Sequence, residues 1–140
     1  MKVTDSDLKN KRVFISGGGS GIGATIVEYF CEQKSEVYFI DIDLKSSNKL
    51  IKKIKKKGFK VPKFIECNIL DVKKLQNIIK DIISKKGAIH CLINSAANDD
   101  RHTTEQVDEK YWENRMGINL KHYFFAAQAV VKGMKKIKSG

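Results

Sequence analysis

Five glycines fall within the short segment VFISGGGSGIGATI (residues 13–26), between an apolar run and a helix-like pattern. Glycine accepts positive φ, so the chain can turn sharply out of a strand at Gly17. The missing Cβ atoms let a ligand lie against the main chain at Gly21 and let the helix pack closely at Gly23. The start of that helix offers unpaired N–H groups and the positive end of its dipole to a pyrophosphate. The segment therefore predicts a dinucleotide-binding turn between a strand and a helix.

Apolar runs and helical periodicities alternate along the rest of the chain. Apolar runs without polar alternation are typical of parallel strands covered on both faces. The predicted strands are residues 12–16, 36–40, 63–67 and 89–96, and the predicted helices are residues 21–34, 44–57, 71–87 and 108–136. The pattern predicts an α/β fold, a doubly wound Rossmann-type αβα sandwich with a parallel sheet, and a single domain over residues 1–140.

The second predicted strand ends in Asp41, eighteen positions after Gly23. A carboxylate at this place can accept hydrogen bonds from an adenosine ribose. It would repel a 2′-phosphate and no arginine follows it, so the sequence favours NAD over NADP. The alternative is that Asp41 only caps the helix that begins near Leu44, although Asp43 is better placed for a cap.

The bulk composition narrows the class of protein. No stretch approaches eighteen consecutive apolar residues and no signal peptide opens the chain, which predicts a cytoplasmic protein without a membrane partner. Cys31, Cys67 and Cys91 are expected to be buried free thiols, and their spacing to the three histidines predicts no metal site. The net charge of +11 raises the alternative of a nucleic-acid binder. The lysines of KLIKKIKKKGFK instead follow the outer face of an amphipathic helix, without interleaved aromatic residues.

These motifs, taken in order, resemble the short-chain dehydrogenase/reductase family along essentially the whole chain. SGGGSGIG is similar to the glycine motif of that family, with Ser16 for threonine; CNILD resembles its adenine-contacting segment, with Asn68 for aspartate. NSAA resembles its Asn-Asn-Ala-Gly motif, with Ser95 and Ala97 as departures. The resemblance implies NAD as cofactor, held by Gly17, Gly19, Ser20, Gly21, Ile22, Gly23, Asp41, Ile42, Asn68, Ile69, Asn94, Ala96 and Ala97. The glycines also fit a second alignment, Gly19-x-Gly21-x-x-Ala24, which again indicates a dinucleotide.

Finer features, NDDRH (98–102), YW (111–112) and FFAAQAV (124–130), resemble the sugar-oxidising branch of the family. The resemblance implies hydride transfer between a hydroxyl-bearing small molecule and nicotinamide, with Asn119 as the catalytic helix asparagine. A tyrosine with a lysine four residues later serves as general base in the family. Here the four tyrosines are followed at that spacing by Gln33, Ile42, Arg115 and Ala127. The expectation is an N-terminal, cofactor-binding half with about four strands and little turnover; the alternative is a binding module without chemistry.

Two further regions each allow more than one interpretation. The charged loop Asp99–His102 follows a strand end and is a sugar-binding loop, a solvated loop or a subunit contact. Trp112 and the aromatic residues 123–125 are expected in the core or at a subunit contact, since the full-length protein is expected to be a homo-oligomer. One broad apolar face of the last helix is expected to carry Met116, Leu120, Tyr123, Phe124, Ala127, Val130, Val131 and Met134.

Overall fold

Four parallel strands form the central sheet of the computed structural model, which describes residues 5–140. They are β1 (Arg12–Ser16), β2 (Glu36–Asp41), β3 (Lys63–Glu66) and β4 (Cys91–Asn94), in the order β3-β2-β1-β4. The predicted strands are confirmed, although β4 is shorter than the expected residues 89–96. Ser16 pairs with both Ile40 and Asn94, so the carboxyl ends of the strands meet at one edge of the sheet.

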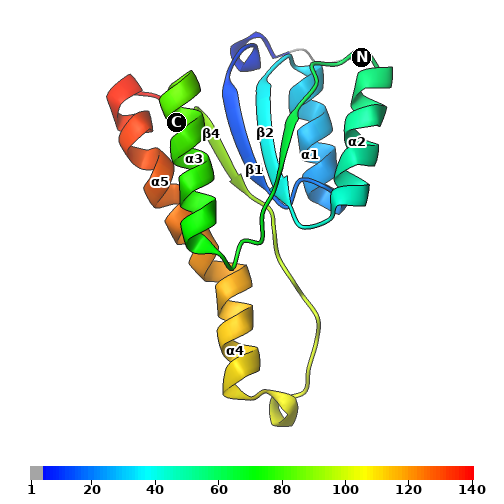
Figure 1. Cartoon of the computed structure of the whole chain (residues 1–140), viewed down its shortest axis with the longest axis vertical. Coiled ribbons are helices and arrows are strands. Elements are labelled where there is room, and N and C mark those ends of the chain that lie inside the picture. Colours follow the sequence, from blue (N-terminus) through cyan, green and yellow to red (C-terminus); the bar gives the residue numbers. More distant parts are fainter. Residues whose placement is uncertain (1–4) are drawn as a thin grey trace.

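Helices cover both faces of this sheet, which confirms the predicted αβα sandwich. They are α1 (Gly21–Glu32), α2 (Leu44–Lys56), α3 (Val72–Lys86), α4 (Glu109–Met116) and α5 (His122–Ile137). Helices α1 and α2 lie on one side of the strands and α3 and α5 on the other, whereas α4 and the loop before it project away from the sheet (Figure 1). Short 3₁₀ turns occupy Ser6–Leu8 and Thr104–Gln106.

The apolar strands serve two cores, one on each face. In β1, Val13 and Ile15 pack with α1 and α2, while Phe14 between them packs with α3 and α5. In β2, Phe39 packs with α1 and α2 and Ile40 packs with α3 and α5. Both side chains are fully buried. Each successive side chain of a strand points to the opposite face, so a sheet covered on both sides needs apolar residues at every position.

Aspartate residues begin three of the α-helices. The carboxylates of Asp43, Asp71 and Asp108 accept backbone N–H groups of Ser46, Lys74 and Tyr111, at 2.9, 2.9 and 2.7 Å. Such caps satisfy N–H groups that have no partner within the helix. Helix α1 begins differently, because Ser20 stands at its N-cap and makes no side-chain cap hydrogen bond.

The predicted helix over residues 108–136 is nearly continuous but contains a π-helical turn at Gly117–Lys121 between α4 and α5. Only part of the predicted broad apolar face is buried in this chain. On α5, the fully covered residues are His122, Ala126 and Val130, four residues apart. Leu120 and Phe124 are 55% and 63% exposed, because they follow a neighbouring stripe that turns away from β4 and α3.

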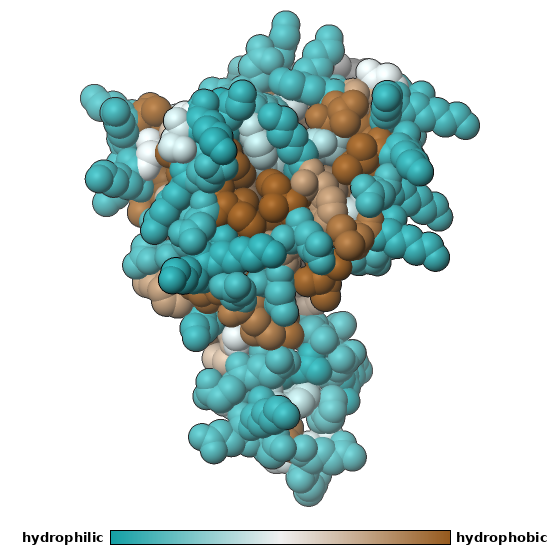
Figure 2. All heavy atoms as spheres, in the orientation of Figure 1, coloured by the Kyte–Doolittle hydropathy of each residue, from teal (hydrophilic) through white to brown (hydrophobic). Residues whose placement is uncertain are grey.

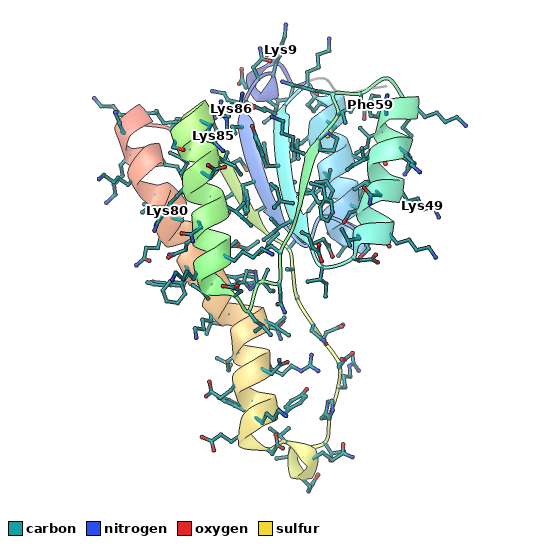
Figure 3. All side chains as sticks on the ribbon, viewed as in Figure 1. Lys9, Lys49, Phe59, Lys80, Lys85 and Lys86 are labelled. Carbon is teal, nitrogen blue, oxygen red and sulfur yellow. The ribbon has the colours of Figure 1, made fainter. Side chains whose placement is uncertain are left out.

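Lysine side chains lie on the outer surfaces of the helices. On α2 the buried positions are Ser47, Leu50 and Ile54, and the lysines of this helix lie on its solvent-exposed face. Lys49 and Lys80 point away from the sheet in Figure 3, and Figure 2 shows apolar atoms gathered between the two helix layers.

Over residues 5–140 no helix combines the length and the apolar character needed to cross a bilayer. Strand β4 is an edge strand, and its residues are each partly exposed.

Two histidines, the partly buried His90 and the fully buried His122, make the stability of the fold sensitive to mild acid. His90 accepts the Arg12 N–H at Nδ1 (2.9 Å), and His122 lies wholly inside the protein. Burial lowers the pKa of both side chains below the ordinary value of 6.5, and the nearby charges of Lys11 and Arg12 lower the pKa of His90 further. Below pH 6.5 the unfolded chain therefore binds protons that the folded chain does not, and folding loses free energy.

We expect the free energy of unfolding to be constant just above pH 6.5 and to fall as the pH drops from 6.5 toward 5.5. Urea unfolding at half-unit pH steps measures it. A His90→Asn, His122→Gln double variant keeps side-chain acceptors that do not titrate, so its stability should depend less on pH over this range. Stability that stays flat or rises in the unaltered chain between pH 6.5 and 5.5 contradicts the prediction.

Candidate functional site

The glycine turn leaves β1 at its carboxyl end, as predicted. Gly17 has a φ of +70°, and its N–H donates to the Ile40 carbonyl at 2.8 Å, which ties the turn to β2. A Cβ built at Gly17 would lie 2.6 Å from the Cα of Ala96, just after β4. Only glycine fits here, since both the dihedral angle and the close approach exclude a side chain.

At the start of α1, Gly23 is tightly packed whereas Gly21 borders open space. A Cβ at Gly23 would lie 1.8 Å from the Gly17 carbonyl oxygen, so the first turn of the helix packs directly on the glycine turn. At Gly21, where φ is +52°, a Cβ would meet nothing within 4 Å. The space above Gly21 is open, and the uncapped end of α1 faces it with its first N–H groups. Such an end favours an anion.

Asp41, the last residue of β2, turns toward the glycines. Its Oδ2 accepts the Gly19 N–H at 2.8 Å, and its Oδ1 accepts the Asp43 N–H at 2.9 Å. Asp43, and not Asp41, caps α2 through Ser46. The helix-cap alternative for Asp41 is therefore wrong. A carboxylate offers about four lone-pair sites, so Asp41 retains capacity to accept further hydrogen bonds.

A cleft of about 560 Å³ opens at this edge of the sheet. It lies where the strand order reverses between β1 and β4, the place at which open α/β sheets bind ligands. Eleven of the thirteen residues proposed for the cofactor line it: Gly17, Ser20, Gly21, Ile22, Gly23, Asp41, Ile42, Asn68, Ile69, Ala96 and Ala97. Gly19 and Asn94 do not. Ile22 and Ile42 are 77% and 68% exposed, so the cleft has apolar as well as polar walls.

Asn94 differs from its predicted place at the cofactor. Its Nδ2 lies 3.5 Å from the Tyr123 carbonyl oxygen, and its Oδ1 is buried without a hydrogen-bond partner. The side chain points to α5 because alternate residues of a strand face opposite sides of the sheet. Gly19 likewise contributes indirectly, through its N–H to Asp41.

Asn68 lines the cleft, but its side-chain carbonyl is already in use. Oδ1 accepts the Leu70 N–H at 3.0 Å, so a bond to an adenine amino group would use the second lone pair of that oxygen. The neighbouring Cys67 also lines the cleft, and burial raises the pKa of its thiol, which stays protonated.

Asn119 lies in the π-helical turn and holds the chain that follows β4. Its Oδ1 accepts the Asn98 N–H and its Nδ2 donates to the Asn98 carbonyl, both at 2.9 Å. The side chain thus fixes the backbone at Asn98, which lines the cleft together with Ile118. This pair of bonds positions one wall of the cleft.

The charged loop after Asn98 divides between the cleft and α4. Asp99 lines the cleft. Asp100 pairs with Arg115 at 3.2 Å, and the His102 ring packs on Tyr111 with centroids 4.2 Å apart. Asp100 and His102 contact α4 and are at the same time exposed to solvent, as expected for a solvated loop.

Five lining residues were not among those predicted for the cofactor: Cys67, Ser95, Asn98, Asp99 and Ile118. Each of them is a direct neighbour of a predicted residue or belongs to the loop already singled out. Ile118 could be found only through its place beside Asn119, since the π-helical turn that aims it at the cleft has no pattern in the sequence. Over residues 5–140, no three His, Cys, Asp or Glu side chains gather as metal ligands.

The family can now be assigned. The sequence model of the short chain dehydrogenases matches residues 11–140. The chain belongs to the short-chain dehydrogenase family. The family uses nicotinamide cofactors, and the resemblance seen in the motifs is confirmed.

Relatives in this family include sugar dehydrogenases. A probable galactose dehydrogenase of Rhizobium meliloti is 37% identical over 134 residues, which cover 96% of this chain and 52% of the relative. A D-xylose 1-dehydrogenase of Caulobacter vibrioides is 40% identical, over 95% of this chain and 52% of that protein. The chain thus spans about half the length of the curated relatives it matches. An aldohexose dehydrogenase of Thermoplasma acidophilum superposes with a TM-score of 0.78 at 25% identity, covering 94% of this chain and 47% of the other.

Proposed function

We propose that this short-chain dehydrogenase chain binds NAD in the cleft at the carboxyl ends of β1, β2 and β4. The observation that carries the proposal is the position of Asp41. Its carboxylate lies at the cleft, held by the Gly19 and Asp43 N–H groups, and is not consumed as a helix cap. An ionised carboxylate there accepts ribose hydroxyls and repels a 2′-phosphate, which favours NAD over NADP.

The remaining walls of the cleft suit the other parts of the dinucleotide. The diphosphate fits at the open space above Gly21, against the uncapped N-terminus of α1. The adenine fits between the exposed Ile42 and the segment Asn68–Ile69, where apolar contact and one amide are available. The nicotinamide end then runs toward Ala96, Ala97 and Ile118, the side on which Asn119 lies. NAD supplies the hydride acceptor, and these residues bind and orient it.

The substrate is proposed to be a sugar or similar hydroxyl-bearing small molecule, because galactose and D-xylose dehydrogenases are among the relatives. Asp99 is the residue of the charged loop that faces the cleft and is proposed to contact the substrate. Hydride removal from an alcohol needs a general base, and none of the four tyrosines here has a lysine four residues later. Asn119 stays proposed as a catalytic residue. Cofactor binding, rather than turnover, is the property to test on these 140 residues.

The partner is proposed from exposed apolar residues and the compartment from the free cysteines. Leu120 of the π-helical turn and Phe124 and Val131 of α5 are exposed apolar residues, which we propose as the contact with a second copy of the chain. The three cysteines are free, which favours a reducing compartment such as the cytoplasm. Among the described residues, the lysines of α2 lie on its outer face and no lysine lines the cleft, so nucleic acid and membrane are not proposed as partners.

Two neighbouring aspartates give a matched test of the proposal. We expect Asp41→Ala to weaken NADH binding about tenfold or more and to reduce the preference over NADPH, because charge-assisted hydrogen bonds to the ribose are lost. Asp43→Ala removes only the cap of α2; it should lower the free energy of unfolding by about 1 kcal/mol and leave NADH affinity within about twofold. Calorimetric titration and urea unfolding measure both variants. If the two substitutions weaken NADH binding equally, Asp41 does not hold the ribose.

A further inference from the structure

A buried serine and histidine meet behind the wall of the cleft. Ser16 ends β1 and His122 begins α5; both are fully buried, and Ser16 Oγ lies 3.3 Å from His122 Nε2. The two residues are 106 positions apart in the sequence. Neither side chain lines the cleft. A buried polar pair of this kind costs free energy unless its hydrogen bonds are satisfied, so the bonding of each atom can be counted.

The hydroxyl of Ser16 is surrounded by donors. Its Oγ accepts the Ser95 N–H at 3.2 Å, a donor that it shares with the Ser16 carbonyl oxygen at 3.2 Å, and the Ala96 N–H at 3.4 Å. A serine hydroxyl has two acceptor lone pairs and a single hydrogen. Because the two backbone groups take both lone pairs, the hydroxyl hydrogen is donated to Nε2 of His122. Nε2 is then the unprotonated nitrogen, and the ring is neutral with its hydrogen on Nδ1.

The other side of the ring faces the π-helical turn. The Ile118 and Gly117 carbonyls lie near the ring and favour its protonated form, but burial has the larger effect and lowers the pKa of His122. The ring also packs edge-on against Tyr123, with centroids 4.3 Å apart. Tyr123 in turn donates its hydroxyl to the Ala96 carbonyl at 3.2 Å. A neutral imidazole thus lies between the end of β4 and the turn.

His122 therefore connects two walls of the cleft. Through Ser16 it reaches Gly17 and Ala96, and as the first residue of α5 it directly follows the π-helical turn that carries Asn119. Asn119 continues the connection to the backbone of Asn98. Among the described residues Nδ1 of His122 is buried without a hydrogen-bond partner, so the contact of Nε2 with Ser16 is the side-chain hydrogen bond that orients the ring.

We propose that His122 is a positioning residue, whose neutral Nδ1–H ring accepts the Ser16 hydroxyl hydrogen at Nε2 and sets the spacing between the glycine turn and the Asn119 turn. The consequence for cofactor affinity rests on the proposed binding of NAD. The hydrogen-bond arrangement itself does not, and it can be tested without any ligand.

Nitrogen NMR of the unaltered 140-residue chain tests the arrangement directly. We expect His122 to show a protonated Nδ1 and an unprotonated Nε2 at neutral pH. In Ser16→Ala the Nε2 resonance should shift, because its donor is gone. A protonated Nε2 in the unaltered chain overturns the proposal, whether or not the variants fold.

Two pairs of variants separate positioning from core filling. His122→Leu fills much of the space without an acceptor, whereas His122→Gln keeps an acceptor at similar reach; Ser16→Ala and Ser16→Thr form the second pair. We expect His122→Leu and Ser16→Ala to weaken NADH binding about tenfold, and to speed hydrogen exchange at the Asn98 amide about tenfold. His122→Gln and Ser16→Thr should stay within about twofold of the unaltered chain on both measures.

The double variant Ser16→Ala, His122→Leu should be no worse than the poorer single variant, because both changes remove the same bond. Additive losses, or equal effects of the leucine and glutamine variants, overturn the positioning role. If the folded unaltered chain binds no NADH, the proposed function fails, but the nitrogen spectrum and the exchange at Asn98 still decide the role of His122.

Discussion

Gly23→Ala should strongly weaken NADH binding and destabilise the fold. The added Cβ would lie 1.8 Å from the Gly17 carbonyl oxygen and 2.8 Å from its carbon, and neither atom belongs to a flexible side chain. Gly17 cannot retreat freely, because its N–H is bonded to Ile40 and its Cα lies close to Ala96. We expect the free energy of unfolding to drop by about 2–3 kcal/mol, the cost of overpacking, and NADH affinity to fall about a hundredfold.

Gly133→Ala is the matched control for that substitution. It places the same methyl group in a helix, α5, where the nearest atom is the Ala88 Cβ at 3.2 Å. Helix propensity favours alanine by about 1 kcal/mol, which offsets the tight contact. Stability should change by no more than about 1 kcal/mol and NADH affinity should not change. If the Gly23→Ala variant binds NADH within twofold of the unaltered chain, the close contact between Gly23 and the Gly17 carbonyl is contradicted.

Phe39→Ala should produce the largest loss of stability. The side chain is fully buried on the α1–α2 side of β2, with its ring centroid 5.2 Å from that of Phe64. A Cβ at Gly18 would lie 2.7 Å from the ring, so Phe39 also supports the glycine turn. Removing a buried phenylalanine side chain costs about 3–5 kcal/mol, a large share of the 5–15 kcal/mol that holds a domain together. The midpoint of urea unfolding measures the change.

Phe124→Ala provides the comparison, since Phe124 is 63% exposed on α5. At a protein concentration where the chain is monomeric, this variant should lose no more than about 0.5 kcal/mol. Phe39→Leu, which keeps most of the volume, should lose less than about 1.5 kcal/mol. Similar losses for Phe39→Ala and Phe124→Ala would show that the two-core packing is misassigned.

The fold could be predicted because its signals are local. The apolar runs of the strands, the periodicity of α2 and the glycine turn each specify their own conformation. The choice between Asp41 and Asp43 as helix cap also follows from local spacing, because a cap accepts the N–H two or three residues ahead. The structure places Asp43 as the cap and leaves Asp41 at the cleft.

The features that escaped prediction depend on residues far apart in the sequence. The π-helical turn at Gly117–Lys121 lies where Gly117 approaches Leu70 and His122 approaches Ser16. The covered stripe of α5 follows from packing on α3 and β4, so periodicity outlined the broad apolar face but could not say that Val130 is buried while Leu120 and Phe124 are exposed. The direction of Asn94 likewise depends on which face of β4 receives α5. Pairings of this kind are set by tertiary contacts and leave no local pattern.

An NMR titration of the isotope-labelled chain with NADH tests the central claim most directly, because it reports affinity and location together. We predict saturable shifts at the amides of Ser20–Gly23, Asp41 and Asn68, with NADPH binding at least about tenfold more weakly. A folded chain whose signals do not move with either nucleotide contradicts the claim. Shifts confined to residues outside the cleft, or equal affinity for NADPH, contradict it as well.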